Sequence, residues 1–380
     1  MTILFDHQAF DMQRYGGVSN CFVQLISRLP DYVHYRLSLE ETDNVHLQES
    51  GIVDVGPARD PSNRFIINRH FLGQGKLYMW YAKRFPSRTT YGRNRLRSIA
   101  DLEQGHFDVF HPTFFDDYFL SHLNGKPFVL TVHDMIPELF YRPNDWQIIN
   151  KKRLVKEASH LIAISEKTKE DLVQMLHVPE DKISVIYHGA PDVYLETGAP
   201  LIDKKYILYV GDRVGYKSFM PMLKSLVPIL TQRRDLHIVC TGKDFTKDER
   251  KAFRDFNIQE QLIHVRPDDQ GMMNLYAYAQ CFIYPSQYEG FGIPILEAYQ
   301  AHCPVMLNQK SCFPEIAQDA AVYFDLDDQH SDLTEVMTHF LSQSREERGQ
   351  LLQRQQQRLS YFSWEKSASQ LTQVYESVLS

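Results

Sequence analysis

The chain carries at residues 285–298 the stretch Pro285-Ser286-Gln287-Tyr288-Glu289-Gly290-Phe291-Gly292-Ile293-Pro294-Ile295-Leu296-Glu297-Ala298. It follows Cys281-Phe282-Ile283-Tyr284, a short, apolar and β-prone run that predicts a buried strand. Pro294 fits the first turn of a helix, where its missing N–H costs nothing. The sequence therefore predicts a strand, a glycine turn and a helix, with Glu289 after the strand and Glu297 in the first turns of the helix.

The two glutamates of this stretch stand eight positions apart around the Gly-Phe-Gly turn. An ionised carboxylate accepts hydrogen bonds from ligand hydroxyls, and free amides at a helix start can hold anionic or hydroxyl oxygens. A capped helix start with solvated carboxylates is the alternative for either glutamate alone. The spacing around the turn favours a ligand site.

Strand-like runs alternate with helical stretches along the chain, which predicts parallel sheets. The first series is Thr2–Phe5, Val109–His111, Phe128–Val132 and Leu161–Ile164, and the second is Tyr206–Val210, Leu236–Cys240, Leu262–Val265, Phe282–Tyr284, Val305–Leu307 and Ala321–Phe324. Between them, Gly189-Ala190-Pro191 and Gly198-Ala199-Pro200 supply turn residues and an expected hinge. We therefore expect an α/β protein of two doubly wound domains facing a cleft, with ligands at the carboxyl ends of the strands.

The glutamate spacing resembles the E-x7-E motif of retaining glycosyltransferases with the GT-B fold, in particular glycosyltransferase family 4. The resemblance covers nearly the whole chain, through Tyr15-Gly16-Gly17-Val18-Ser19, Thr131-Val132-His133-Asp134-Met135-Ile136-Pro137, Ile164-Ser165, Val185-Ile186-Tyr187-His188-Gly189, Leu208-Tyr209-Val210-Gly211 and Phe362-Ser363-Trp364-Glu365. It implies two Rossmann-like domains: an N-terminal acceptor domain at residues 1–190 and a nucleotide-sugar donor domain at residues 191–362. It also implies that residues 363–380 cross back as a helix and complete the first domain.

The resemblance gives the glutamate stretch a role in donor binding. Glu289 matches the residue that contacts hydroxyls of the donor sugar, with help from the amides of Gly290, Phe291 and Gly292. Glu297 matches the carboxylate that binds the nucleotide ribose.

Two cations follow the first strand of the donor domain. Arg213 and Lys217 match the family's Arg/Lys pair on the donor diphosphate. An arginine and a lysine four positions apart are by themselves more often solvated, but the glycine at the strand end and the resemblance favour binding. Arg266 stands where the family usually has a glycine, which leaves recognition of the nucleotide base open.

The resemblance also assigns residues of the first domain. His133 follows a strand and matches the histidine that hydrogen-bonds the transferred sugar near the reacting carbon. Asp134 is a weaker candidate, for acceptor binding or for orienting the histidine. Gly16 and Gly17 match the family's glycine loop, where a side chain would block the approach of the backbone to the donor phosphate. A lone histidine is more often structural and a Gly-Gly pair more often a plain turn, so these roles depend on the motif.

The family implies transfer of a hexose with retention of configuration, to a glycan or a lipid-linked glycan in polysaccharide biosynthesis. GDP-mannose is the first expected donor and a UDP-hexose the second. We expect a front-face mechanism in which the leaving phosphate helps to deprotonate the acceptor, without a metal ion or other cofactor. Asp325-Leu326-Asp327 is formally a D-x-D motif, but it closes a strand and is interpreted as structural.

Other functions fit the same motifs less well. A sugar-nucleotide epimerase or a phosphorylase with this architecture would react without an acceptor or with free phosphate. A non-catalytic scaffold conflicts with the intact set of candidate residues. A dinucleotide dehydrogenase is disfavoured because no G-x-G-x-x-G follows the first strand.

Composition gives the expected cellular setting. The five cysteines form no C-x-x-C pair, which favours reduced thiols in a cytoplasmic protein. No apolar run is long enough to span a bilayer, so membrane contact is expected to be peripheral, at the inner face of the cytoplasmic membrane.

The net charge of −7 hides a basic segment at Arg59–Arg97. It contains ten cations against one acid, Asp60, and seven aromatic residues run through it. Such interleaving can bind nucleic acid or an anionic membrane with a lipid-linked phosphate. A helical hairpin with a solvated basic face is the alternative. Nothing else in the sequence indicates nucleic acid, so a membrane is the expected partner.

Overall fold

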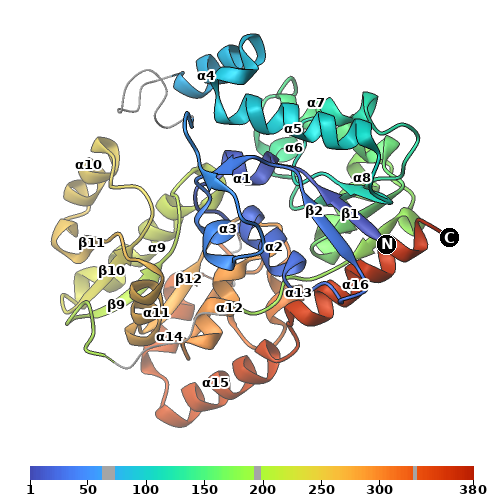
Figure 1. The fold of residues 1–380 in the computed structure, drawn as a ribbon. Coiled ribbons are helices and arrows are strands. Elements are labelled where there is room, and N and C mark those ends of the chain that lie inside the picture. Colours follow the sequence, from blue (N-terminus) through green and yellow to red (C-terminus); the bar gives the residue numbers. More distant parts are fainter. Residues whose placement is uncertain (62–72, 192–197, 328–331) are drawn as a thin grey trace. The chain divides into compact units, whose positions relative to one another are not determined.

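The computed structural model describes residues 1–61, 73–191, 198–327 and 332–380 (Figure 1). The chain forms two compact units. The first is Met1–His188 together with Trp364–Ser380, and the second is Gly189–Ser363. The Arg59–Arg97 segment falls in the first unit, although residues 62–72 of it lie outside the described residues.

Parallel strands form the centre of the first unit. One sheet has the order β2-β1-β5, from β2 (His34–Leu37), β1 (Thr2–Phe5) and β5 (Val109–His111). Another has the order β6-β7-β8, from β6 (Val129–Val132), β7 (His160–Ala163) and β8 (Ile183–Val185). A parallel bridge between Phe110 and Phe128 links the two sheets, and β3 (Glu41–Thr42) pairs with β4 (Gly56–Pro57).

Helices surround these strands in the first unit. They are α1 (Gln8–Met12), α2 (Gly17–Ile26), α3 (Val45–Ser50), α4 (Gln74–Arg84), α5 (Thr90–Gln104), α6 (Ile136–Phe140), α7 (Trp146–Glu157), α8 (Glu166–Leu176) and α16 (Trp364–Ser377). All four residues of β6 are buried, as expected for a strand covered on both faces.

The second unit contains a six-stranded parallel sheet of order β11-β10-β9-β12-β13-β14. Its strands are β9 (Lys205–Tyr209), β10 (Leu236–Cys240), β11 (Leu262–His264), β12 (Cys281–Tyr284), β13 (Val305–Asn308) and β14 (Val322–Phe324). Its helices are α9 (Phe219–Gln232), α10 (Lys247–Asp255), α11 (Asp269–Tyr278), α12 (Ile293–Gln300), α13 (Phe313–Ala317), α14 (Leu333–Ser342) and α15 (Arg345–Leu359). In chain order the sheet reads 3-2-1-4-5-6, the Rossmann arrangement. The predicted α/β doubly wound fold is confirmed.

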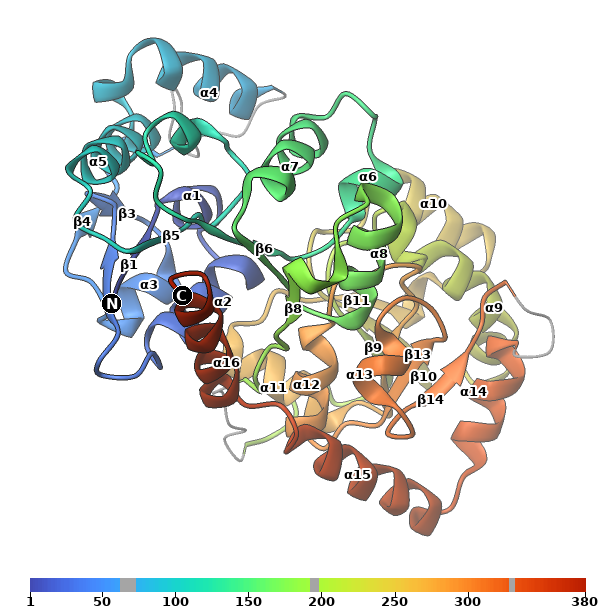
Figure 2. The ribbon, with the colours of Figure 1, turned by 90° about the vertical axis from the view of Figure 1, so that its right-hand side faces the viewer.

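The last helix, α16, packs against α2 in the first unit, as both ribbon views show (Figures 1 and 2). It inserts Trp364, Leu371 and Tyr375 into the core that contains Phe5 and Phe22. The predicted return of the C-terminal helix to the first domain is therefore confirmed.

We expect Leu371→Ala to destabilise the first unit by about 2–5 kcal/mol, because this side chain is fully buried and its loss leaves a cavity. Chemical denaturation followed by circular dichroism measures the change. Leu379→Ala is the matched control, since Leu379 lies just beyond α16 and is exposed. Equal denaturation midpoints for the wild type and Leu371→Ala would contradict this packing role.

Candidate active site

The strand order of the second unit reverses between β9 and β12, which are neighbours in the sheet. The chain moves outward in one direction from β9 and in the other direction from β12. Crevices at such a point, outside the carboxyl ends of the strands, are where doubly wound sheets bind ligands. Lys217 follows β9 and Glu289 follows β12, so the sheet brings these two candidate residues together at this point.

Lys217 and Glu289 form a direct ion pair. The Lys217 ammonium lies 2.9 Å from Glu289 Oε1, and the buried Ser286 hydroxyl donates to the same oxygen at 2.8 Å. Ser311, which follows β13, accepts from the Glu289 amide at 3.1 Å and donates to the Glu289 carbonyl at 2.8 Å. Glu289 is thus held at its side chain and its backbone, which fixes the position of the carboxylate at the strand end.

The turn after Glu289 leads into α12 through Gly292. Gly292 has φ = 96°, and a Cβ there would lie 3.1 Å from the side chain of Ile295 and 3.3 Å from that of Phe313. Glycine therefore fits this turn both in backbone conformation and in space. Gly290 and Phe291 complete the turn, and both are buried.

Glu297 lies within α12, next to Tyr276 of α11. The Tyr276 hydroxyl donates to Glu297 Oε2 at 2.9 Å. Burial raises the pKa of Glu297 above its usual value, and the hydrogen bond from Tyr276 partly opposes this rise. The carboxylate is oriented by one neighbour and only partly exposed.

Arg213 is held inside the second unit. Its Nε donates to Glu249 at 2.7 Å, and its other nitrogens donate to the carbonyls of Thr241, Lys243 and Asp244 at 2.6–3.2 Å. Its side chain is only 4% exposed. This conformation ties the loop after β9 to the loop after β10, and a diphosphate contact would require some of these bonds to be exchanged. The diphosphate role of Arg213 stays a prediction.

Arg266 is exposed just after β11. It lines a hollow of about 680 Å³ in the second unit together with Val265, Pro267 and residues of α11. Arg266, which stands where the family usually has a glycine, therefore lies beside a space large enough for a ligand.

His133 directly follows β6 in the first unit and is buried. Its ring packs edge-on against Phe22 and lies parallel to the ring of His188, with centroids 6.3 Å apart. Burial, followed by the nearby charge of Lys151, lowers the pKa of His133 to about 4. The imidazole is therefore neutral near pH 7, and it can act as a hydrogen-bond donor at one nitrogen and an acceptor at the other.

Asp134 contacts the backbone at the start of α6. Its Oδ1 accepts from the Ile136 amide at 2.9 Å, and its carbonyl accepts from the buried Lys151 ammonium at 2.9 Å. Lys151 also pairs with Glu138 at 2.8 Å. These contacts support a positioning role for Asp134, because they fix the chain immediately after His133.

Gly16 and Gly17 stand at the start of α2. A Cβ on Gly16 would lie 2.1 Å from Gln13 Oε1, the oxygen that accepts from the Ser19 amide at 3.2 Å. A side chain at position 16 would therefore have to displace the group that caps the first turn. This is a structural reason for the glycine, separate from its predicted contact with phosphate.

The D-x-D sequence after β14 has a cationic neighbour. Lys310 lies 2.8 Å from Asp325 and 3.6 Å from Asp327. A lysine at this distance supports the structural interpretation.

Several residues near the candidate site escaped the sequence analysis. Ser311 follows β13, the strand next to β12 in the sheet. A polar residue directly after that strand was the sign in the sequence that could have indicated it. Tyr276 and Lys151 lie within helices, where nothing in the sequence links them to Glu297 or Asp134.

Two protein-family models match this chain. The family model for group 1 glycosyl transferases matches residues 199–358, and the model for glycosyltransferase family 4 matches residues 15–192. The chain therefore contains a glycosyltransferase family 4 domain followed by a group 1 glycosyl transferase domain. The family 4 match covers most of the first unit and the group 1 match lies in the second, and together they contain every candidate site residue.

Relatives of this glycosyltransferase include proteins named as mannosyltransferases. O-antigen chain mannosyltransferase RfbU of Salmonella typhimurium is 28% identical over 53% of this chain and 58% of its own length, so the match spans less than two thirds of that relative. O-antigen chain mannosyltransferase B of Escherichia coli is 26% identical over 68% of this chain and 72% of its own. The GDP-mannose:cellobiosyl-diphosphopolyprenol alpha-mannosyltransferase of Xanthomonas campestris is 27% identical over 69% and 70%.

Solved structures show the same fold. The crystal structure of Anabaena Alr3699/HepE in complex with UDP and glucose superposes with a TM-score of 0.74 at 15% identity, covering 99% of this chain and all of the other. A glycosyltransferase from Rickettsia africae gives a TM-score of 0.65 at 16% identity, covering 100% and 98%. The predicted GT-B fold is thereby confirmed.

Proposed function

We propose that this glycosyltransferase transfers mannose from GDP-mannose, with retention of configuration, to a glycan or a lipid-linked glycan acceptor. The observation that carries the proposal is the ion pair of Lys217 with Glu289, held by Ser286 and Ser311 at the switch point of the second sheet. A cation beside a fixed carboxylate suits a ligand that carries both phosphates and sugar hydroxyls.

In the proposed reaction, the acceptor hydroxyl attacks the anomeric carbon while the bond from that carbon to the phosphate oxygen breaks. The electron pair goes to the diphosphate, and the acceptor proton moves to a phosphate oxygen. Lys217 stabilises the charge that develops on the leaving group. Glu289 and the amides of the glycine turn hold the sugar hydroxyls, Glu297 holds the ribose, and the neutral His133 ring positions the transferred sugar. This route uses no metal ion.

The choice of donor rests on the relatives. Three of them are named mannosyltransferases, and one is named for GDP-mannose and a diphosphopolyprenol acceptor. Exposed Arg266 supports a guanine base, because a guanidinium can donate two parallel hydrogen bonds to guanine O6 and N7. A UDP-hexose is the second candidate donor, favoured by the UDP complex of the similarly folded HepE.

The test is incubation of the protein with GDP-mannose and a diphosphopolyprenyl-linked glycan. We expect release of GDP, addition of one hexose to the acceptor by mass spectrometry, and an α-anomeric product by NMR. A UDP-hexose as the sole productive donor would overturn the mannose assignment. Release of mannose or an epimer without any acceptor would overturn the transferase assignment.

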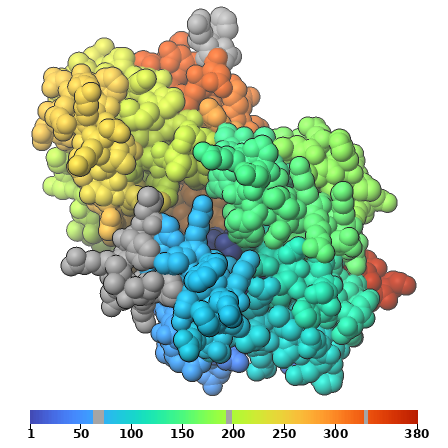
Figure 3. Space-filling model, turned by 90° about the horizontal axis from the view of Figure 1, so that it is seen from above, coloured from blue at the N-terminus to red at the C-terminus, as the bar shows by residue number. Residues whose placement is uncertain are grey.

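We also propose that the basic segment binds an anionic membrane through α4. Within the basic segment, Arg93 bonds to Glu41 and Asp60, and Arg97 bonds to Asp101, so these two cations are committed to internal contacts. The exposed side chains of α4 instead form one face of the helix: Lys76, Leu77, Trp80, Lys83 and Arg84. The helix lies on the surface shown in light blue in Figure 3. Cations beside a tryptophan suit an anionic headgroup layer.

We expect Lys76→Glu/Lys83→Glu/Arg84→Glu to lower sedimentation with anionic liposomes by about a hundredfold in partition coefficient, since each cation contributes about 1 kcal/mol. The matched control reverses three exposed lysines of the second unit, Lys224, Lys247 and Lys251. Wild-type protein that ignores anionic liposomes at low salt would refute the membrane contact. In the described part of the chain, no helix has the length and apolarity to cross a bilayer.

A further inference from the structure

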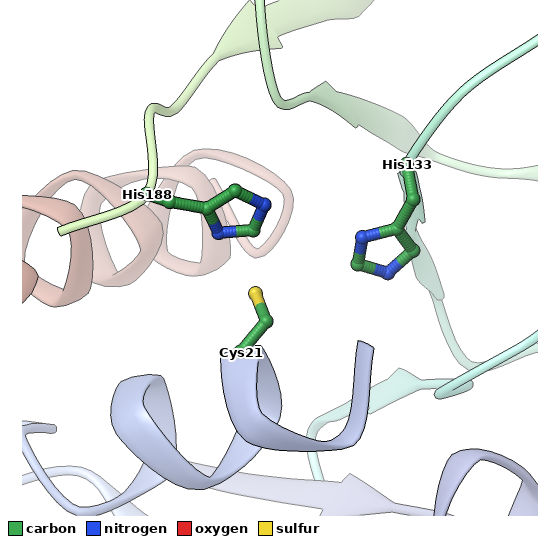
Figure 4. Close-up of side chains that lie close together, drawn as sticks. All are labelled: Cys21, His133 and His188. Atoms are coloured by element: carbon green, nitrogen blue, oxygen red, sulfur yellow. The ribbon is translucent and has the colours of Figure 1, made fainter. Parts of the chain in front are cut away.

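Three side chains that can ligate a metal converge inside the first unit. Cys21 lies in α2, His133 follows β6, and His188 follows β8. One ligand atom from each lies within 4.8 Å of the others, and all three residues are buried. Figure 4 shows the two imidazole rings side by side, with the Cys21 sulfur below them, under the inner edge of the His188 ring. Among the described residues, this is the group that brings together sulfur and nitrogen donors at such distances.

The ligand atoms that the two histidines offer are ring nitrogens, and both rings are buried beyond the ends of parallel strands. Figure 4 shows the Nδ1 nitrogen of His133 turned toward His188. The other ring nitrogen, Nε2, is buried and has no hydrogen-bond partner among the described residues.

We propose that Cys21, His133 and His188 form a binding site for Zn²⁺. One thiolate and two imidazoles suit zinc, whereas Mg²⁺ and Ca²⁺ prefer oxygen ligands. Three protein ligands leave the fourth tetrahedral position for water. When the zinc–sulfur bond forms, the Cys21 thiol loses its proton to solvent.

The distances require only a small closure. Zinc–nitrogen and zinc–sulfur bonds of about 2.0–2.3 Å in tetrahedral geometry place ligand atoms roughly 3.3–3.8 Å apart. Because the ligand atoms lie within 4.8 Å of one another, any pair has to approach by at most about 1.5 Å.

Zinc bound here would take His133 away from the donor sugar. This consequence rests on the proposed function, in which the same imidazole positions the sugar. Zinc and a nucleotide sugar are then expected to exclude each other, and the exclusion must be reciprocal in binding. Zinc bound at this site therefore inhibits sugar transfer. An inhibitory zinc is consistent with a transfer reaction that itself uses no metal.

The binding experiment uses the whole chain, freed of metal by dialysis against a chelator, and Zn²⁺ or Co²⁺ alone. We expect one equivalent of Zn²⁺ per chain in competition with a chromogenic chelator. With Co²⁺ we expect a near-ultraviolet thiolate-to-metal absorption band. Cys21→Ser is expected to lose the band and the stoichiometric zinc. Cys303→Ser, a buried cysteine of the second unit, is the matched control and keeps both.

Wild-type protein without a cobalt–thiolate band, or with the same zinc binding as Cys21→Ser, would overturn the site. The wild-type measurement alone decides this if Cys21→Ser fails to fold. Competition is tested separately: Zn²⁺ should raise the apparent Kd for GDP-mannose in the wild type but not in Cys21→Ser. A zinc site without this competition would refute the inhibitory role, while failure of GDP-mannose to bind metal-free protein would count against the proposed function instead.

Discussion

Replacing Lys217 with alanine is expected to lower kcat for sugar transfer by about a hundredfold to a thousandfold, a loss of about 2.7–4 kcal/mol of transition-state stabilisation. Lys217 supplies a preorganised positive charge at the switch point, where the leaving diphosphate gains negative charge. Its ion pair holds it 2.9 Å from Glu289, with 18% of the side chain exposed, so little reorganisation precedes the reaction. Removing the ammonium also leaves the Glu289 carboxylate without its cation and disfavours an anionic ligand.

Steady-state kinetics with saturating GDP-mannose measure this effect. Lys243→Ala is the matched control, because Lys243 also belongs to the second unit but is 82% exposed and pairs with the half-buried Asp212. We expect Lys243→Ala to retain kcat within about twofold, as surface ion pairs contribute little. Wild-type kcat in Lys217→Ala would remove Lys217 from the leaving-group site.

His133→Ala is expected to lower kcat by about tenfold to a hundredfold while the Kd for GDP changes little. One hydrogen bond that strengthens in the transition state accounts for this magnitude. The ring is neutral and fixed between Phe22 and His188, so it can contact the transferred sugar but contributes no charge to nucleotide binding.

The comparison of kcat with GDP affinity separates positioning of the sugar from a structural role. His106→Ala, at an exposed histidine of the same unit, controls for loss of an imidazole. Parallel losses of kcat and GDP binding in His133→Ala would indicate a structural histidine. A thermal melt of the apo variant shows whether the unit remains folded.

The sequence predicted the central strands well, because strands buried on both faces are continuous apolar runs. Cys281–Tyr284 and Leu236–Cys240 are fully buried in the structure, and both were predicted within one residue. The edge strands β2 and β8 were not predicted. His34–Leu37 is partly exposed and mixes polar with apolar residues, and Ile183–Val185 is only three residues long, so neither carries a clear periodic signal.

The candidate site was predictable where it lies in one stretch of sequence. Glu289, the glycine turn and Glu297 follow directly from residues 285–298. Contacts made by residues distant in sequence were not predictable. Ser311 orients Glu289 across a separation of 22 residues, and Tyr276 reaches Glu297 from a different helix.

Arg213 illustrates a different limit of the sequence. Its position after β9 suggested a phosphate contact, but its charge is paired with Glu249 and its ring neighbours are Phe219 and Phe245. Whether a cation faces a ligand or the interior depends on carboxylates and aromatic rings that arrive from other parts of the chain. The convergence of Cys21, His133 and His188 was likewise beyond reach, because no spacing in the sequence links a cysteine of a helix to two histidines that follow separate strands.

The central claim is that the second unit binds a nucleotide sugar at the switch point of its sheet, and the most direct measurement is calorimetric titration of metal-free protein with GDP-mannose. The account predicts saturable binding of one equivalent, with about 2.7 kcal/mol of added stability at a hundredfold excess over Kd, and weaker binding in both Glu297→Ala and Lys217→Ala. Absence of binding for GDP-mannose and for UDP-hexoses, or binding that both variants retain at wild-type strength, would contradict it.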